Sequence, residues 1–167
     1  EGQALDDMYY DAEMRPQMSI GGYYGIHREY NEDGGASEIV YLDVDGLPSC
    51  GTNGVAREKR SFDNEGRVIQ TFFFDPKNKP VSLQSGQEGE AYSYDENNRI
   101  SQITFLDRNG NPMEATTGYT ILKRTYYRDG TEKISRYFDA AGNPVSLSKG
   151  QYGIKRIGDV TIYIDQN

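Results

Sequence analysis

The chain has 167 residues, a formal net charge of −8 and only 35% hydrophobic residues, with 14 Tyr and no Trp. It carries no clustered Lys and Arg, so we expect no nucleic-acid partner. Its apolar runs, such as residues 39–42, are far too short to cross a bilayer, so we expect no membrane insertion. A single cysteine, Cys50, excludes an internal disulfide and a cysteine-based zinc site.

Three residue types recur every 32 residues without an insertion. A fixed period of this kind predicts tandem copies of one structural unit. The recurring positions are Asp11, Asp43, Asp75, Asp107 and Asp139; Pro16, Pro48, Pro80, Pro112 and Pro144; and Gly22, Gly54, Gly86, Gly118 and Gly150. We therefore expect a single repeat domain over residues 1–167. Its expected units are 1–21 (partial), 22–53, 54–85, 86–117, 118–149 and a C-terminal cap at 150–167.

Each unit is expected to hold two strands joined by tight turns, after a lone strand near residues 5–10. The first strands are expected at 24–30, 56–62, 88–94, 120–126 and 152–157, and the second strands at 36–42, 68–74, 100–106 and 132–138. Gly158 opens a two-residue loop typical of a type II′ turn, with a short last strand at 160–164. About eleven strands predict an all-β fold of stacked β-hairpins, an open, twisted, solenoid-like sheet with modified end caps.

The recurring aspartates and prolines are expected to be structural. An Asp side chain at the start of a turn accepts backbone N–H groups two residues further on, and Gly or Asn then adopts the left-handed conformation. Proline cannot extend a hydrogen-bonded ladder. Asp43 and Asp107 also resemble the start of calcium loops, but no bidentate carboxylate follows at a suitable spacing. We expect neither a bound metal nor a cofactor.

Short motifs resemble two bacterial repeat families. Residues 62–68 (FDNEGRV) and 94–100 (YDENNRI) are similar to YD (RHS-type) repeats. Residues 137–145 (YFDAAGNPV) resemble the aromatic-Asp-x-x-Gly turn of clostridial cell-wall-binding repeats. The resemblance implies a β-hairpin repeat module of a bacterial protein, located extracellularly or at the cell surface.

Aromatic residues form two columns at the ends of the expected strands. The first column is Tyr30, Phe62, Tyr94 and Tyr126, and the second is Tyr41, Phe73, Phe105 and Tyr137. Such columns can stack on sugar rings, but we favour a role as the core between neighbouring hairpins. The middle copies of the second column, Phe73 and Phe105, lack a hydroxyl, as burial would favour.

Two further groups are candidate ligand-binding residues. The loop tyrosines flank the recurring glycines and either contact a ligand or cover the ends of hairpins. The arginines, two positions before the first aromatic column, either bind acidic groups of a polymer or pair with neighbouring carboxylates. The tyrosines are Tyr23, Tyr24, Tyr119 and Tyr152, and the arginines are Arg28, Arg60, Arg124 and Arg156.

Catalysis is not expected, because His27 is the only histidine and regular columns do not form one asymmetric catalytic site. The leading hypothesis is a non-enzymatic repeat module of a surface-associated protein that binds a polysaccharide, such as a cell-wall polymer or a host glycan. The alternative is a structural spacer or scaffold without a ligand. A protein partner that pairs with an exposed sheet edge is a third hypothesis.

Overall fold

The computed structural model describes residues 4–166, and this range contains eleven antiparallel strands and no helix. Its contacts divide the chain into two compact units, residues 1–84 and 85–167. The predicted all-β class is confirmed. Residues 1–3 and 167 of the predicted terminal units lie outside the described residues.

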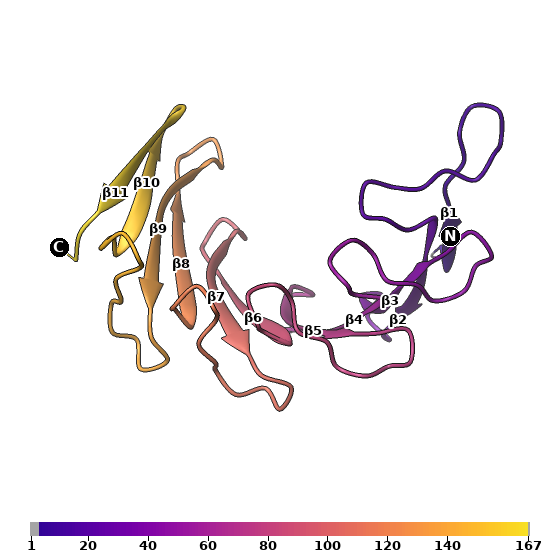
Figure 1. The fold of residues 1–167 in the computed structure, drawn as a ribbon, viewed down its shortest axis with the longest axis horizontal. Helices are drawn as coiled ribbons and strands as arrows, with labels where there is room; N and C mark the ends of the chain where they lie inside the picture. Colours follow the sequence, from indigo (N-terminus) through magenta and orange to yellow (C-terminus); the bar gives the residue numbers. More distant parts are fainter. Residues whose placement is uncertain (1–3, 167) are drawn as a thin grey trace. The chain divides into compact units, whose positions relative to one another are not determined.

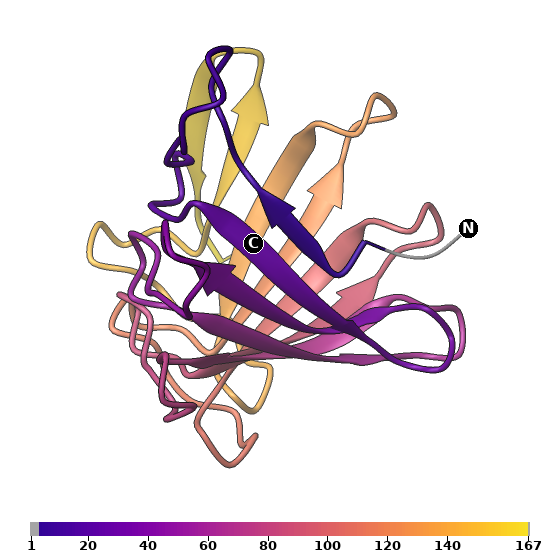
Figure 2. The same ribbon diagram turned by 90° about the vertical axis from the view of Figure 1, so that its right-hand side faces the viewer.

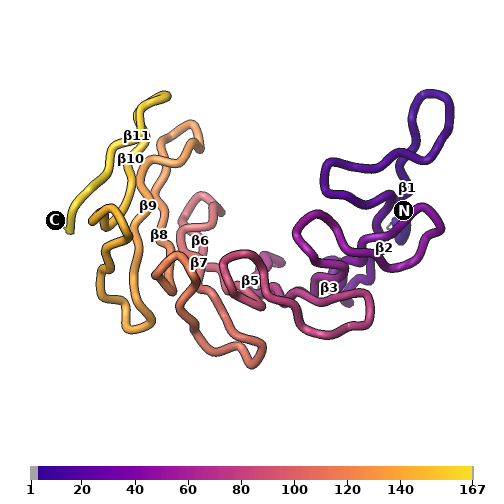
Figure 3. The backbone as a smooth tube through the Cα atoms, in the orientation of Figure 1, coloured from indigo at the N-terminus to yellow at the C-terminus, as the bar shows by residue number. Residues whose placement is uncertain are grey.

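The first unit is an open antiparallel sheet whose strands lie in chain order, each paired with the next (Figures 1 and 2). Its strands are β1 (Asp6–Met8), β2 (Gly25–Tyr30), β3 (Ala36–Leu42), β4 (Arg57–Phe62) and β5 (Val68–Phe74). Short turns join β2 to β3 and β4 to β5, whereas a long loop leads from β3 to β4 (Figure 3).

The second unit has the same order of pairing and one additional hairpin. Its strands are β6 (Gly89–Tyr94), β7 (Ile100–Leu106), β8 (Ile121–Tyr126), β9 (Glu132–Phe138), β10 (Gly153–Ile157) and β11 (Val160–Ile164). The two-residue loop between β10 and β11 has Gly158 at φ 56°. Asp159 is not among the residues with positive φ, so the predicted type II′ turn is confirmed.

The strands begin within a residue of their predicted positions because the turns between them are built as expected. In each predicted turn the fourth residue is left-handed, for example Gly66 at φ 77° and Asn98 at φ 64°. The recurring aspartates act as predicted: the Oδ1 atom of Asp107 accepts the backbone N–H groups of Asn109 and Asn111. Equivalent bonds are made by Asp11, Asp43, Asp75 and Asp139.

The recurring prolines also pair with the strand that precedes them. Each lies opposite the residue six positions before it in an isolated antiparallel bridge, as Pro48 does with Leu42. The same bridge is formed by Pro16, Pro80, Pro112 and Pro144. The next residue donates its backbone N–H back to the strand, as Ser49 does to Tyr41 at 2.9 Å. The chain therefore folds back briefly at the end of each second strand before it enters the long loop.

The cores of both units come from the second aromatic column and the apolar residues beside it. Phe73 is 7% exposed in the first unit and Phe105 is 6% exposed in the second, as their missing hydroxyls predicted. Tyr41, nearer the chain's start, is half-buried and its hydroxyl donates to Oε1 of Glu58 at 2.5 Å. Burial, followed by that carboxylate, raises the pKa of Tyr41 well above its usual range.

A β-bulge immediately precedes every residue of the first aromatic column. The register shifts between Ser61 and Phe62 in the first unit and between Thr125 and Tyr126 in the second. The same shift precedes Tyr30 and Tyr94. A bulge bends its strand and changes where neighbouring side chains lie. These four rings stand at the turn end of each hairpin, at the last pair of the ladder.

Candidate functional site

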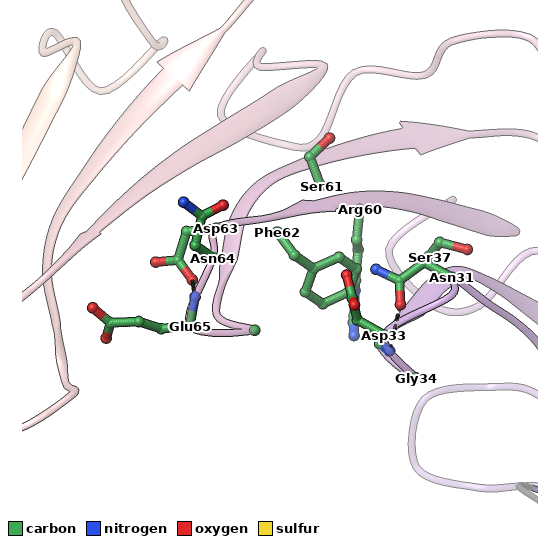
Figure 4. Close-up of a pocket in the computed structure, with 12 residues that line it drawn as sticks. Asn31, Asp33, Gly34, Ser37, Arg60, Ser61, Phe62, Asp63, Asn64 and Glu65 are labelled. Atoms are coloured by element: carbon green, nitrogen blue, oxygen red, sulfur yellow. Dashed lines mark hydrogen bonds between the residues drawn. The ribbon is translucent and has the colours of Figure 1, made fainter.

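A hollow in the first unit lies between two neighbouring hairpin turns, β2–β3 and β4–β5 (Figure 4). We call it the Phe62 groove. Its volume is about 790 Å³ and it is open to solvent. It is lined by Asn31, Asp33, Gly34, Gly35, Ser37, Arg60, Ser61, Phe62, Asp63, Asn64, Glu65 and Gly66. One aromatic ring surrounded by amide, hydroxyl and carboxylate groups is a lining suited to a polar ligand with an apolar face.

The two turns are held in shape by their own first residues. The Oδ1 atom of Asn31 accepts the backbone N–H of Gly35 at 2.7 Å, and Oδ1 of Asp63 accepts that of Glu65 at 2.9 Å (Figure 4). The fourth residues, Gly34 and Gly66, have φ of 84° and 77°, a conformation that glycine adopts without strain. The polar rim of the groove therefore sits on two rigid turns.

The Phe62 ring forms the floor because Gly35 lets it approach the neighbouring turn. A Cβ atom at Gly35 would lie only 2.9 Å from Cζ of the Phe62 ring. The ring thus packs against bare backbone and remains half-buried. No side chain extends from Gly35 over the ring.

The groove is acidic, with three carboxylates and one guanidinium in its lining. Arg60 is bound to Glu58, with 2.6 Å between its Nη2 and Oε2. Arg67 pairs with Asp63 at 2.7 Å and with Glu65 at 3.0 Å. The backbone N–H of Arg67, and then its side chain, hold the pKa of Asp63 below its usual range. Asp33 is exposed and has no ion-pair partner among the described residues, so it leaves an unbalanced negative charge at the rim.

The second unit has a corresponding hollow between the β6–β7 and β8–β9 turns, which we call the Tyr126 groove. It is lined by Asn97, Arg99, Tyr126, Tyr127, Arg128, Asp129 and Gly130, and its volume is about 330 Å³. Arg99, which stands 64 residues after Gly35, places its guanidinium carbon 4.8 Å from the centre of the Tyr126 ring. It also donates to the Tyr127 carbonyl at 3.0 Å and pairs with Asp95 at 2.7 Å. A cation of the chain itself therefore occupies this groove.

The predicted loop tyrosines are half-buried, and two of them stack within the cores. Tyr23 lies 4.5 Å from Tyr41 between ring centres and 6.1 Å from Tyr9. Tyr119 lies 5.3 Å from Phe105 and 4.9 Å from Tyr137. Desolvation raises the pKa of Tyr119. Tyr23 stacks on Tyr41, and Tyr119 packs at a tilt between Phe105 and Tyr137, which makes both rings part of the packing within their units.

Tyr24 and Tyr152 are half-buried as well, and their backbones join the ladders. Tyr24 donates to the Leu42 carbonyl at 2.7 Å, and Tyr152 donates to that of Ile164 at 2.9 Å. The four tyrosines therefore do not form the fully exposed row that would mark a ligand platform.

The predicted arginines are all paired with carboxylates. Arg28 binds Asp7 at 2.5 Å in the first unit, where Arg60 binds Glu58. In the second unit Arg124 and Arg156 share Glu132, each at 3.2 Å. Of the four, Arg60 lines the Phe62 groove, and Arg156 lines a hollow of about 510 Å³ with Tyr127 and Asp129. These ion pairs correspond to the second of the two roles considered for the four arginines, which is pairing with neighbouring carboxylates.

Sequence reasoning assigned Phe62 and Tyr126 to a core column and did not single out their turns. The close packing of the Phe62 ring on Gly35 was not foreseen. A usable signal was nonetheless present, because Gly35 stands where residues 67 and 99 are both arginine. A glycine at this position places no cationic side chain over the neighbouring ring.

Comparison with known proteins adds no assignment: no protein-family model matches the chain, and no curated protein matches it significantly. Within residues 4–166, no cluster of three or more His, Cys, Asp or Glu side chains is arranged to hold a metal ion. The described part of the chain also has no helix long and apolar enough to cross a membrane. His27, the only histidine in the sequence, pairs through Nδ1 with Asp6 at 2.8 Å.

Proposed function

We propose that the chain is a non-enzymatic binding module of a bacterial surface-associated protein, built from tandem 32-residue β-hairpin repeats that stack as a solenoid-like array. Its ligand is a polysaccharide, either a cell-wall polymer or a host glycan. The observation that carries the proposal is the groove at the hairpin-turn end, in which an aromatic floor is bordered by polar side chains. Sugar rings present apolar C–H faces and hydroxyl edges, which such a lining complements.

The Phe62 groove is open to solvent, so one residue of a long polysaccharide can lie in it while the rest of the chain continues past it. In the second unit the Tyr126 groove is closed by Arg99, and the hollow beside it is lined by Tyr127, Asp129 and Arg156 among others. Charge favours neutral or cationic polymers, since the net charge is −8.

A saturable-binding assay against purified bacterial cell-wall fractions and a glycan panel tests this function. We expect binding that persists at high salt for neutral sugars and falls at least tenfold in Phe62→Ala. Tyr163→Ala is the matched control, because Tyr163 is an aromatic residue, 56% exposed on β11, that lines neither groove. Equal loss in both variants, or no loss in either, contradicts a glycan site at Phe62.

The second candidate is a structural spacer without a ligand. It is favoured by the pairing of all four column arginines and by the stacking of Tyr23 and Tyr119 within the cores. Absence of binding to every fraction and every glycan, with the module folded, selects the spacer.

A further inference from the structure

The two grooves occupy equivalent places in the 32-residue period and differ in one decisive residue. Position 35 is glycine, whereas position 99, two periods later, is arginine. Arg99 closes the Tyr126 groove with its own guanidinium, and the volume there is about 330 Å³ compared with about 790 Å³ at Phe62. The Tyr126 groove is thus filled by a cation of the chain, whereas in the Phe62 groove the ring packs against Gly35 and residue 35 places no cation over it.

The contacts of Arg99 identify the groups that a cation meets in such a groove. They are the face of an aromatic ring, a backbone carbonyl of the facing turn and a carboxylate. The Phe62 groove retains the first two kinds of group: the Phe62 ring and the carbonyl of Asp63, which stands 64 residues before Tyr127. The carboxylate position is changed, because residue 31 is Asn where residue 95 is Asp.

The missing negative charge is supplied from elsewhere on the rim. Asp33 lines the groove and has no ion-pair partner within the described residues, whereas Asp63 and Glu65 share one partner, Arg67. Cations are attracted to the face of an aromatic ring, and more strongly where a carboxylate lies nearby. By contrast, the Tyr126 groove has two guanidinium groups and one carboxylate in its lining.

We propose that the Phe62 groove binds the ammonium group of an amino sugar, so that the glycan recognised by the module is rich in free, non-acetylated amines. This inference rests on the proposed glycan-binding function and specifies its ligand class. The ammonium lies against the exposed part of the Phe62 ring, with Asp33 as its counter-charge. The sugar ring of the same residue covers the remainder of the groove.

Reciprocal exchange of the two positions provides the test. Gly35→Arg reproduces the closed groove in the first unit, and Arg99→Gly opens the groove in the second. The probe is a glucosamine oligomer, titrated calorimetrically beside its fully N-acetylated form and a uronic-acid oligomer of equal length. We expect the glucosamine oligomer to bind at least tenfold more tightly than the other two. We also expect at least a tenfold loss in Gly35→Arg and additional binding capacity in Arg99→Gly.

Two further variants keep the test decisive if Gly35→Arg disturbs the turn, since its Cβ would press on the Phe62 ring. Asp33→Asn keeps the shape and should remove the preference for the free amine, and Phe62→Leu should weaken both amino-sugar probes. Circular dichroism and thermal melting establish that each variant is folded.

The outcomes separate this inference from the function on which it rests. Equal binding of acetylated and free-amine oligomers at Phe62 overturns the amine inference and leaves glycan binding intact. Binding of an arginine-rich peptide, with no binding of any sugar probe, overturns both and assigns the groove to a protein partner. Absence of binding by every probe overturns both and supports the spacer.

Discussion

The two units share a strand order and turn chemistry but use one equivalent turn position differently. In the first unit Gly35 leaves the Phe62 ring open to an acidic groove. In the second, Arg99 covers the Tyr126 ring and is itself held by Asp95 and a backbone carbonyl. The lesson is that equivalent hairpin turns of one repeat can have different linings, because the side chain at one position, Gly35 or Arg99, decides whether the chain itself places a cation over the neighbouring ring.

The largest expected effect concerns what the units have in common, their buried rings. Replacing Phe73 in the first unit or Phe105 in the second by Ala should destabilise folding by ~3–5 kcal/mol, because each substitution leaves a cavity in a packed core. Urea unfolding followed by circular dichroism measures the loss. Phe62→Ala is the contrast, and it should cost clearly less because the ring is half-buried. A near-neutral Phe105→Ala would contradict the assignment of the second column to the core.

The strands and turns could be read from the sequence because they depend on local chemistry. An aspartate that accepts two N–H groups, a left-handed Gly or Asn and a proline fix each turn wherever they occur, as Asp107, Gly110 and Pro112 do. The groove could not be read in the same way. It depends on the close approach of the Phe62 ring to Gly35, which arises only when two hairpins lie side by side.

The candidate side chains show the same limit. The repeat period shows that Tyr23 and Arg60 stand at defined positions of the unit. It does not show what surrounds them, because neighbours from other strands decide whether a tyrosine packs in a core and whether an arginine has an ion-pair partner. Tyr23 meets Tyr41 and Arg60 meets Glu58. Residues at equivalent positions of the repeat therefore could not be distinguished in the sequence, although their surroundings in the fold differ.

The next largest effect separates the two grooves. Arg99→Gly should lower stability by about 1–2 kcal/mol, because it removes a partly buried ion pair and a cation–π contact. Arg128→Gly is the matched control, since this exposed arginine also lines the Tyr126 groove but has no ion pair among the described residues. Unfolding measured in low and high salt gives both values. Equal losses in the two variants would contradict a closing role for Arg99.

A smaller loss of stability is expected if the loop tyrosines Tyr23 and Tyr119 pack within the cores of their units. Tyr119→Leu and Tyr23→Leu should each cost about 0.5–1.5 kcal/mol, the contribution of aromatic pairs beyond their buried area. Neither variant should change affinity for a glycan, because neither residue lines the two grooves. Loss of affinity at unchanged stability would return these tyrosines to the ligand-binding role.

The smallest effect concerns acidification of the turns in both units. Hydrogen bonds from the backbone N–H of Asn111 and of Arg67 lower the pKa of Asp107 and Asp63, respectively. A carboxyl whose pKa is lower in the folded state stabilises it fully above the unfolded pKa, about 4, and loses that contribution as the pH falls through the folded pKa. We expect constant stability from these groups above about pH 5 and a decline below about pH 4. In Asp107→Asn, the free energy of unfolding, measured with urea at several pH values, should fall less steeply below pH 4. An unchanged fall would contradict a stabilising role for the Asp107 carboxylate.

The most direct test of the account is a residue-resolved NMR titration of the module with a glucosamine oligomer. The account predicts saturable shifts of the amide signals of residues 31–37 and 60–66. Those of residues 95–99 and 126–131 should stay unchanged until Arg99 is replaced by Gly. Equal shifts at both grooves in the unaltered protein, or shifts confined to the loops of Tyr23 and Tyr119, would contradict it.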